Sequence, residues 1–455
     1  MNFAIPNIIS RNNQLQNENR QLLLMIVLFA IAPFVIFLYA LFTYRNRNSQ
    51  LIIVLFTALF GYNMIAESES MDLSRNHEIL LRYSQFSLLE ILNSYFQAMF
   101  HSQNSSFSKN EDITSASPDL YVGLIAVIVS RFTTNAKILM SLFGLIYGYV
   151  FVKSMQKFIV IQPNSYLSNI PVLCAAFMMP LAQLAGVRYS TATYLFFLGV
   201  ISIINSDSSK YYFLLFLACL THFSFMIPSF LFLIFRFYSI GINESKIKIV
   251  YLIYIASFFL PNLILNLTTN SFITNLLGTG LLSKSNDYAN AEVNIDMALD
   301  FNSTAAWYII YPFKLAFGFV HMAVFARSIT FFKIKHTIQS DKILIWVVVL
   351  LSFSNFSMGV SNLGSRLSMV SALFFFYYLL KLYSENQNLQ IVKSLVIMSL
   401  VFVGLKIILE TRFIIEYTTP IFFYGSVFHI VNDNATMSLW TNISDFIFNI
   451  SHRKA

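Results

Sequence analysis

The stretch QLLLMIVLFAIAPFVIFLYALFT, residues 21–43, contains no charged side chain. A helix needs about 20 such residues to cross the hydrocarbon core of a bilayer, so this stretch alone predicts a membrane span. Further apolar runs lie at approximately 51–66, 136–158, 169–185, 187–204, 211–221, 222–237, 249–266, 305–331, 343–360, 366–383 and 392–410, with ambiguous runs at 119–133 and 413–430. The sequence therefore predicts an all-α, polytopic membrane protein with about 12–14 transmembrane helices.

The overall composition supports the same fold class. Of the 455 residues, 57% are hydrophobic and only 11% are charged, whereas about 25% are charged in a soluble domain. These values exclude a disordered chain, a fibrous chain and a soluble nucleic-acid binder, so we expect no nucleic-acid partner. The net charge of +8 is better explained by membrane topology. Cys174 and Cys219 both lie inside apolar runs, which argues against a disulfide framework and a cysteine-ligated zinc site.

Lysine and arginine in short loops indicate the orientation, because such loops stay on the cytoplasmic side. Four loops of this kind occur, at 44–50, 153–168, 236–248 and 327–342. Two long loops, 67–118 and 267–304, carry more acidic than basic residues and are expected to face outward. If the loop 67–118 lies outside and the loop 153–168 lies inside, the chain must cross the membrane an odd number of times between them. Two apolar runs, 119–133 and 136–158, lie in this interval. We therefore interpret 119–133 as a half-inserted or surface helix.

No internal repeat and no attached soluble domain is visible along the chain. We expect residues 1–430 to form a single integral membrane domain, with the outward loops 67–118 and 267–304. Residues 431–455 are expected to form a polar C-terminal tail.

The first outward loop has the highest density of chemically active side chains. It begins ESESMDLSRNHE at residues 67–78 and continues to Arg82. A carboxylate of Glu67, Glu69 or Asp72 could deprotonate a sugar hydroxyl, and Arg75 or Arg82 could neutralise a departing phosphate. Apolar residues at helical spacing also predict an amphipathic helix here. We favour both interpretations together, with the apolar stripe on the membrane and the acidic start reaching the site.

Two arginines each open an apolar run after a turn that contains glycine. They are Arg188, after Gly186, and Arg366, after Gly364. An arginine at a helix end commonly extends to the membrane interface without a further role. Two guanidinium groups on the same outward face, however, could bind a diphosphate in a bidentate manner, as lysine could not.

His222 interrupts the apolar stretch 211–238 within the sequence LTHFS, residues 220–224. The stretch is longer than one crossing requires, so we predict two short helices or one broken helix. A lone buried histidine usually packs in a core with a hydrogen bond. The break in the helix makes a substrate-binding role for His222 a competing hypothesis.

Several common motifs are absent from the sequence. There is no GxxxxGK[ST] loop, no GxGxxG, no GxSxG, no HExxH and no CxxC, which disfavours ATP-driven transport, a bound nucleotide and a metal site. We therefore expect no cofactor and no metal. The function classes that remain are an enzyme that acts on a lipid-borne substrate and a transporter.

The order of the motifs resembles a known family. Two spans precede the loop with Asp72, Arg75 and Arg82, and there follow PDLY at 118–121, GVRYSTA at 186–192, LTHFS at 220–224 and SRL at 365–367. This order resembles the EpsG-like branch of the Wzy-type O-antigen and capsular polysaccharide repeat-unit polymerases. It is more distantly similar to GT-C membrane glycosyltransferases, which implies a GT-C-like architecture with amphipathic helices in the first outward loop.

The resemblance implies a reaction and a set of partners. A growing glycan would pass from undecaprenyl diphosphate to the non-reducing end of a lipid-linked repeat unit, with inversion, at the periplasmic face of the bacterial inner membrane. The expected partners are the undecaprenyl diphosphate-linked oligosaccharide, the lipid bilayer and a chain-length regulator protein.

The resemblance also implies roles for individual residues. Arg188 and Arg366 would hold the diphosphate, His222 would border it, and Asp72 with Arg75 would lie at the acceptor side. Glu67, Glu69 and Asp72 all remain candidates for the base. Tyr189 occupies a position where the family commonly has glutamine, which removes an amide donor.

Three other functions fit the residues as well. They are a transporter or flippase of lipid-linked glycans, a GT-C transferase that adds one sugar from a polyprenyl-linked donor, and an O-antigen ligase.

Overall fold

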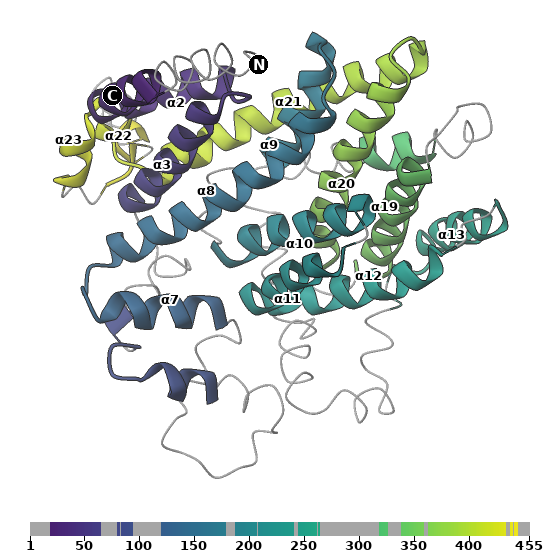
Figure 1. The fold of residues 1–455 in the computed structure, drawn as a ribbon, viewed down its shortest axis with the longest axis horizontal. Helices are drawn as coiled ribbons and strands as arrows, with labels where there is room; N and C mark the ends of the chain where they lie inside the picture. The colour runs from purple at the N-terminus through teal and green to yellow at the C-terminus, as the bar shows by residue number, and fades with distance from the viewer. Residues whose placement is uncertain are drawn as a thin grey trace, which may run out of the picture.

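The fold was analysed in a computed structural model, which describes residues 19–64, 80–81, 83–93, 120–178, 187–206, 208–240, 244–261, 263, 318–325, 338–358, 363–433, 437–439 and 441–444. These residues form helices joined by turns, and no strand occurs among them (Figure 1). The all-α prediction is therefore confirmed. The α-helices include α2 (Pro33–Phe42), α3 (Arg47–Asn63), α7 (Leu120–Ser130), α8 (Ala136–Ile161), α9 (Asn169–Met178), α10 (Val187–Ser206), α11 (Tyr212–Thr221), α12 (Met226–Tyr238), α13 (Glu244–Ser257), α19 (Ile338–Phe356), α20 (Leu363–Glu385), α21 (Gln390–Tyr417), α22 (Ile421–Tyr424) and α23 (Val427–Val431). The predicted span 21–43 is divided at Ala32 into the helices Asn19–Ile31 and Pro33–Phe42.

Most of these helices coincide with the apolar runs of the sequence. Within the described part of the chain, α8, α10 and α20 are long and apolar enough to cross a membrane, and shorter apolar helices include Pro33–Phe42, Leu120–Ser130 and Ser209–Thr221. The ambiguous run 413–430 is not one span. Its first residues belong to α21, which ends at Tyr417 because Thr418 is extended and Pro420 follows. The short helices α22 and α23 form most of the remainder.

The helices α3 and α8 lie side by side and run antiparallel (Figure 1). At one end of the pair, Gln156 donates to the Gln50 side chain at 2.8 Å. At the other end, the Lys137 ammonium lies 5.8 Å from the ring centroid of Tyr62. Gly144 and Gly148 of α8 allow the close contact, because a Cβ atom at either position would collide with Thr57 of α3.

Aromatic side chains fill the contact between α10, α12, α19 and α20. Trp346 of α19 is fully buried. Its ring centroid lies 5.1 Å from that of Phe232, 6.2 Å from that of Phe196 and 6.1 Å from that of Phe374. These tilted and edge-to-face pairs hold four helices together by dense apolar packing.

The helix bundle has two distinct ends. One end, which we call the basic end, is marked by the loop 162–169, where Arg45 donates to Gln162 and Asn164. At the same end the Ser165 hydroxyl lies 2.9 Å from the Tyr383 hydroxyl, near the C-terminus of α20. We call the other end, where α3 ends and α8 and α20 begin, the site end.

The helix α7, Leu120–Ser130, follows the first outward loop and precedes α8. The end of α3 and the start of α8 lie at the same end of the bundle, because the Lys137 ammonium lies over the Tyr62 ring. The interpretation of 119–133 as a helix that does not cross stays a prediction.

Candidate functional site

The two arginines of the predicted clamp lie at the starts of α10 and α20. Arg188 is the second residue of α10 and is half-buried. Arg366 lies in the first turn of α20 and is also half-buried. The first turn of a helix presents backbone N–H groups that lack a partner inside the helix, so both starts favour anions.

The start of α20 is fixed against the end of α19. The Ser354 hydroxyl donates to the Gly364 carbonyl at 2.7 Å and lies 2.6 Å from the Ser368 hydroxyl. Gly364 allows this contact, because a Cβ atom there would lie 2.9 Å from Cα of Met358. The turn that contains glycine therefore sets the position from which Arg366 extends.

Tyr189 joins the two helix starts. Its hydroxyl donates a hydrogen bond of 2.6 Å to the backbone carbonyl of Arg366. Its ring also faces the Arg366 guanidinium, with Cζ 5.3 Å from the ring centroid. A hydrogen bond contributes about 1 kcal/mol and a cation–π contact a similar amount. The hydrogen bond thus fixes the backbone of Arg366, and the ring contact places its guanidinium beside the residue that follows Arg188.

His222 lies at the predicted helix break and borders the same tyrosine. The helix α11 ends at Thr221, and a short 3₁₀ turn, Phe223–Phe225, leads into α12. The His222 ring is edge-on to Tyr189, with the ring centroids 5.6 Å apart at 83°. The prediction of a broken helix is confirmed, and the structure places His222 beside the start of α10.

The hydrogen bonds of His222 define its tautomer. The backbone N–H of Ser224 donates to Nδ1 at 3.2 Å, and the Ser224 hydroxyl lies 2.9 Å from the same atom. Because a backbone N–H can only donate, Nδ1 is an acceptor, and the proton of the neutral ring is on Nε2. The side chain is buried. It caps the turn and carries a donor on its other nitrogen.

Of the three predicted residues, Arg366 and His222 both contact Tyr189, and Arg188 is the residue before Tyr189 in α10. The residues Glu67, Glu69, Asp72, Arg75 and Arg82 lie outside the described residues.

Sequence reasoning missed the role of Tyr189. It treated this residue as the loss of an amide donor, whereas the hydroxyl and ring of Tyr189 hold Arg366 and contact His222. The only available signal was its position next to Arg188.

The described side chains do not suggest a metal centre. Among them, no group of three or more His, Cys, Asp or Glu residues is placed as metal ligands would be. Around Tyr189 the structure places one guanidinium group, that of Arg366, and the imidazole ring of His222.

Comparison with known proteins gives one match. A family model described as EpsG family matches residues 84–419. This region contains Arg188, Tyr189, His222 and Arg366. No curated protein and no solved structure matches the chain significantly. The match and the apolar helices together identify a membrane protein of the polysaccharide polymerase type.

Proposed function

Because this chain belongs to the EpsG family, we propose that it is a polysaccharide polymerase that uses a lipid diphosphate-linked donor. It transfers a growing glycan from undecaprenyl diphosphate to the non-reducing end of a lipid-linked repeat unit. Such a donor is already activated, so the reaction requires no nucleotide.

One observation carries this proposal. The contacts of Tyr189 with the Arg366 carbonyl and guanidinium bring the starts of α10 and α20 together. Arg188 precedes Tyr189 on α10, so both arginines belong to the two helix starts that this contact joins. Arginine binds phosphate oxygens with paired N–H donors, and helix starts add a favourable dipole. A diphosphate is the ligand that best matches this arrangement.

The transfer proceeds by a displacement at the anomeric carbon of the donor. A hydroxyl of the acceptor repeat unit attacks this carbon as the bond to the diphosphate oxygen breaks, and the configuration inverts. The electron pair of the broken bond stays on undecaprenyl diphosphate. Arg188 and Arg366 stabilise this charge as it develops, and His222 donates from Nε2 to the same group.

The proton of the attacking hydroxyl passes to a carboxylate of the first outward loop. Asp72 is our first candidate, with Glu67 and Glu69 as the alternatives and with Arg75 and Arg82 at the acceptor side. This loop joins α3 to α7, and α3 ends at the same end of the bundle as the starts of α8 and α20.

The proposal includes a location and a partner. The site end of the bundle lies at the periplasmic face of the inner membrane, and the basic end, with Arg45 and Lys153, lies in the cytoplasm. A chain-length regulator protein would cooperate with the polymerase there.

Substitution of the two arginines tests the clamp. We expect Arg188→Ala and Arg366→Ala each to abolish long chains, while single repeat units still reach the surface. Arg188→Lys and Arg366→Lys should also lose most activity, because lysine keeps the charge but not the paired donors. Gel analysis of the surface glycan measures both effects. A normal ladder of chain lengths in both alanine variants would refute the clamp.

Substitution of the first candidate base tests the acceptor side. We expect Asp72→Asn to reduce polymer formation far more than His321→Ala, because an amide cannot accept the proton at neutral pH. His321 is a suitable comparison, since its Nδ1 lies 2.6 Å from the Tyr254 hydroxyl in a separate, partly buried pair. An equal loss of polymer formation in the two variants would mean that another residue is the base.

A further inference from the structure

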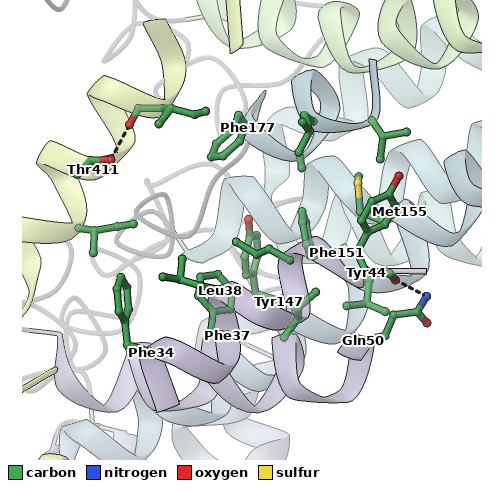
Figure 2. Close-up of a pocket in the computed structure, with 18 of the residues that line it drawn as sticks. Phe34, Phe37, Leu38, Tyr44, Gln50, Tyr147, Phe151, Met155, Phe177 and Thr411 are labelled. Atoms are coloured by element: carbon green, nitrogen blue, oxygen red, sulfur yellow. Dashed lines mark hydrogen bonds between the residues drawn. The ribbon is translucent and has the colours of Figure 1, made fainter. Parts of the chain in front are cut away.

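A cavity of about 460 Å³ lies away from the residues of the proposed diphosphate site. Side chains of α2, α3, α8, α9, α21 and α22 line it (Figure 2). Its volume is within the range of about 300–1,000 Å³ that is typical of small-molecule sites. Neither the catalytic proposal nor the family match assigns it a role.

Hydrocarbon forms almost all of the cavity wall. Phe34, Phe37, Phe151 and Phe177 contribute rings to it. Figure 2 shows Tyr44 and Gln50 together at one side of the cavity and Thr411 at the other. A ligand that fills this space must therefore be apolar over most of its length.

The cavity is open toward the surroundings of the bundle. Four of its lining leucine and isoleucine side chains are 36–42% exposed, namely Leu38, Leu41, Leu173 and Ile407. In a membrane protein an opening of this kind faces lipid, and water is excluded from it. A hydrocarbon chain could enter from the side.

One end of the cavity is polar and positively charged. The Tyr44 hydroxyl donates to Gln162 at 2.8 Å, and the adjacent Arg45 donates to Gln162 at 3.2 Å and to Asn164 at 3.1 Å. These two bonds occupy two of the five N–H donors of the arginine. Arg45 is exposed and keeps donors for an anionic group at the mouth of the cavity.

This charged end is far from the proposed diphosphate site. Arg45 binds the loop 162–169, and Ser165 of that loop contacts Tyr383 of α20. Arg366 lies on the same helix, and a rise of about 1.5 Å per residue places Tyr383 about 25 Å from it along the axis. This separation approaches the thickness of the hydrocarbon core. A lipid with its head group at Arg45 therefore belongs to the opposite leaflet from a donor whose diphosphate is at Arg366.

We propose that the cavity binds one acyl chain of an anionic phospholipid, with the phosphate at Arg45. The hydrocarbon wall selects the chain, and the guanidinium selects the negative head group. The bound lipid fills the space between α2, α9 and α21, which would otherwise lack packing. This inference does not depend on the polymerase proposal, because its test requires no glycan substrate.

The first test fills the cavity. Ala176 of α9 lines it, so we expect Ala176→Phe to abolish the retention of phospholipid by the purified full chain, as measured by native mass spectrometry. Ala30→Phe is the matched control, since Ala30 is exposed and does not line the cavity. Ala176→Leu repeats the test with a smaller side chain in case the first variant does not fold. Equal retention by either cavity variant and the control would overturn the proposal.

The second test removes the charge at the mouth. In nanodiscs of mixed phosphatidylglycerol and phosphatidylcholine, we expect the unaltered chain to retain phosphatidylglycerol. Arg45→Gln should weaken this retention about tenfold, because a charge-assisted hydrogen bond is lost. Arg131→Gln, in the connection before α8, should have no effect. Retention of phosphatidylcholine to the same extent, or unchanged retention of phosphatidylglycerol by Arg45→Gln, would overturn the proposal.

Discussion

Tyr189 is the residue on which the geometry of the site depends. One side chain binds the backbone of Arg366, faces its guanidinium and contacts the ring of His222. It is buried, so its hydroxyl requires a partner, and the Arg366 carbonyl provides it. We regard Tyr189 as a positioning residue, because it acts on a ligand through Arg366.

Two substitutions of Tyr189 separate its contacts. Tyr189→Phe keeps the ring beside the guanidinium and loses the hydrogen bond, so we expect about a fivefold lower rate of polymer elongation. Tyr189→Leu loses both contacts and should reduce the rate further. The measurement is elongation by the purified chain with lipid-linked repeat units.

The order of the two effects is the informative result. A positioning role also predicts a weaker binding of lipid diphosphate in both variants, with the folded fraction unchanged. If Tyr189→Phe were as inactive as Arg366→Ala, the hydroxyl would act on the substrate itself.

At the scale of elements, the sequence predicted the existence of most helices but not their contacts. Apolar periodicity and length placed α8, α10 and α20 almost where the structure has them. The break at His222 was also predictable, because a polar residue with a proline shortly after it interrupts a run. The separation of α22 and α23 from α21 was missed, because apolar composition does not show where a helix ends.

The contact between α3 and α8 gives a test at this scale. Gly144→Ala places a Cβ atom against the backbone of Thr57, which cannot move without shifting the helix. We expect the change to lower the free energy of unfolding by about 1–3 kcal/mol, as other overpacked cores do. A thermal unfolding measurement in detergent should show a lower midpoint.

Gly404→Ala is the matched control for this change. Gly404 lies in α21, and a Cβ atom there would have no neighbour within 4 Å. Alanine also favours a helix more than glycine does. This variant should therefore be as stable as the unaltered chain or slightly more stable. Similar destabilisation in both variants would mean that helix propensity, and not the contact with Thr57, matters at Gly144.

At the scale of the whole molecule, the two ends of the bundle differ in chemistry. The basic end gathers Arg45, Lys153 and the loop 162–169, whereas Arg366, Tyr189 and His222 lie at the site end. The helix α8 spans the distance between these ends. Its flanking residues Phe132 and Tyr166 are 85% and 94% exposed, so neither side chain is covered by the described protein.

Cysteine labelling in intact cells tests the orientation. We expect Phe132→Cys to react with a membrane-impermeant maleimide from outside, and Tyr166→Cys to react only after the membrane is opened. The unaltered chain is the control for Cys174 and Cys219, of which the first is buried and the second partly buried. Reaction of both variants from the same side would show that α8 does not cross.

Four features were predictable from the amino-acid sequence: the fold class, the approximate spans, the helix break at His222 and the two arginines that follow glycine turns. Each of these depends on local composition, because hydrophobic length and charge are properties of a short segment. Helix packing was needed to show that Arg366 lies against Tyr189, that His222 lies beside the same ring, and that a cavity of about 460 Å³ lies between α2 and α21. These features join residues far apart in the chain, and their positions follow from helix packing, which depends on the shapes of facing side chains.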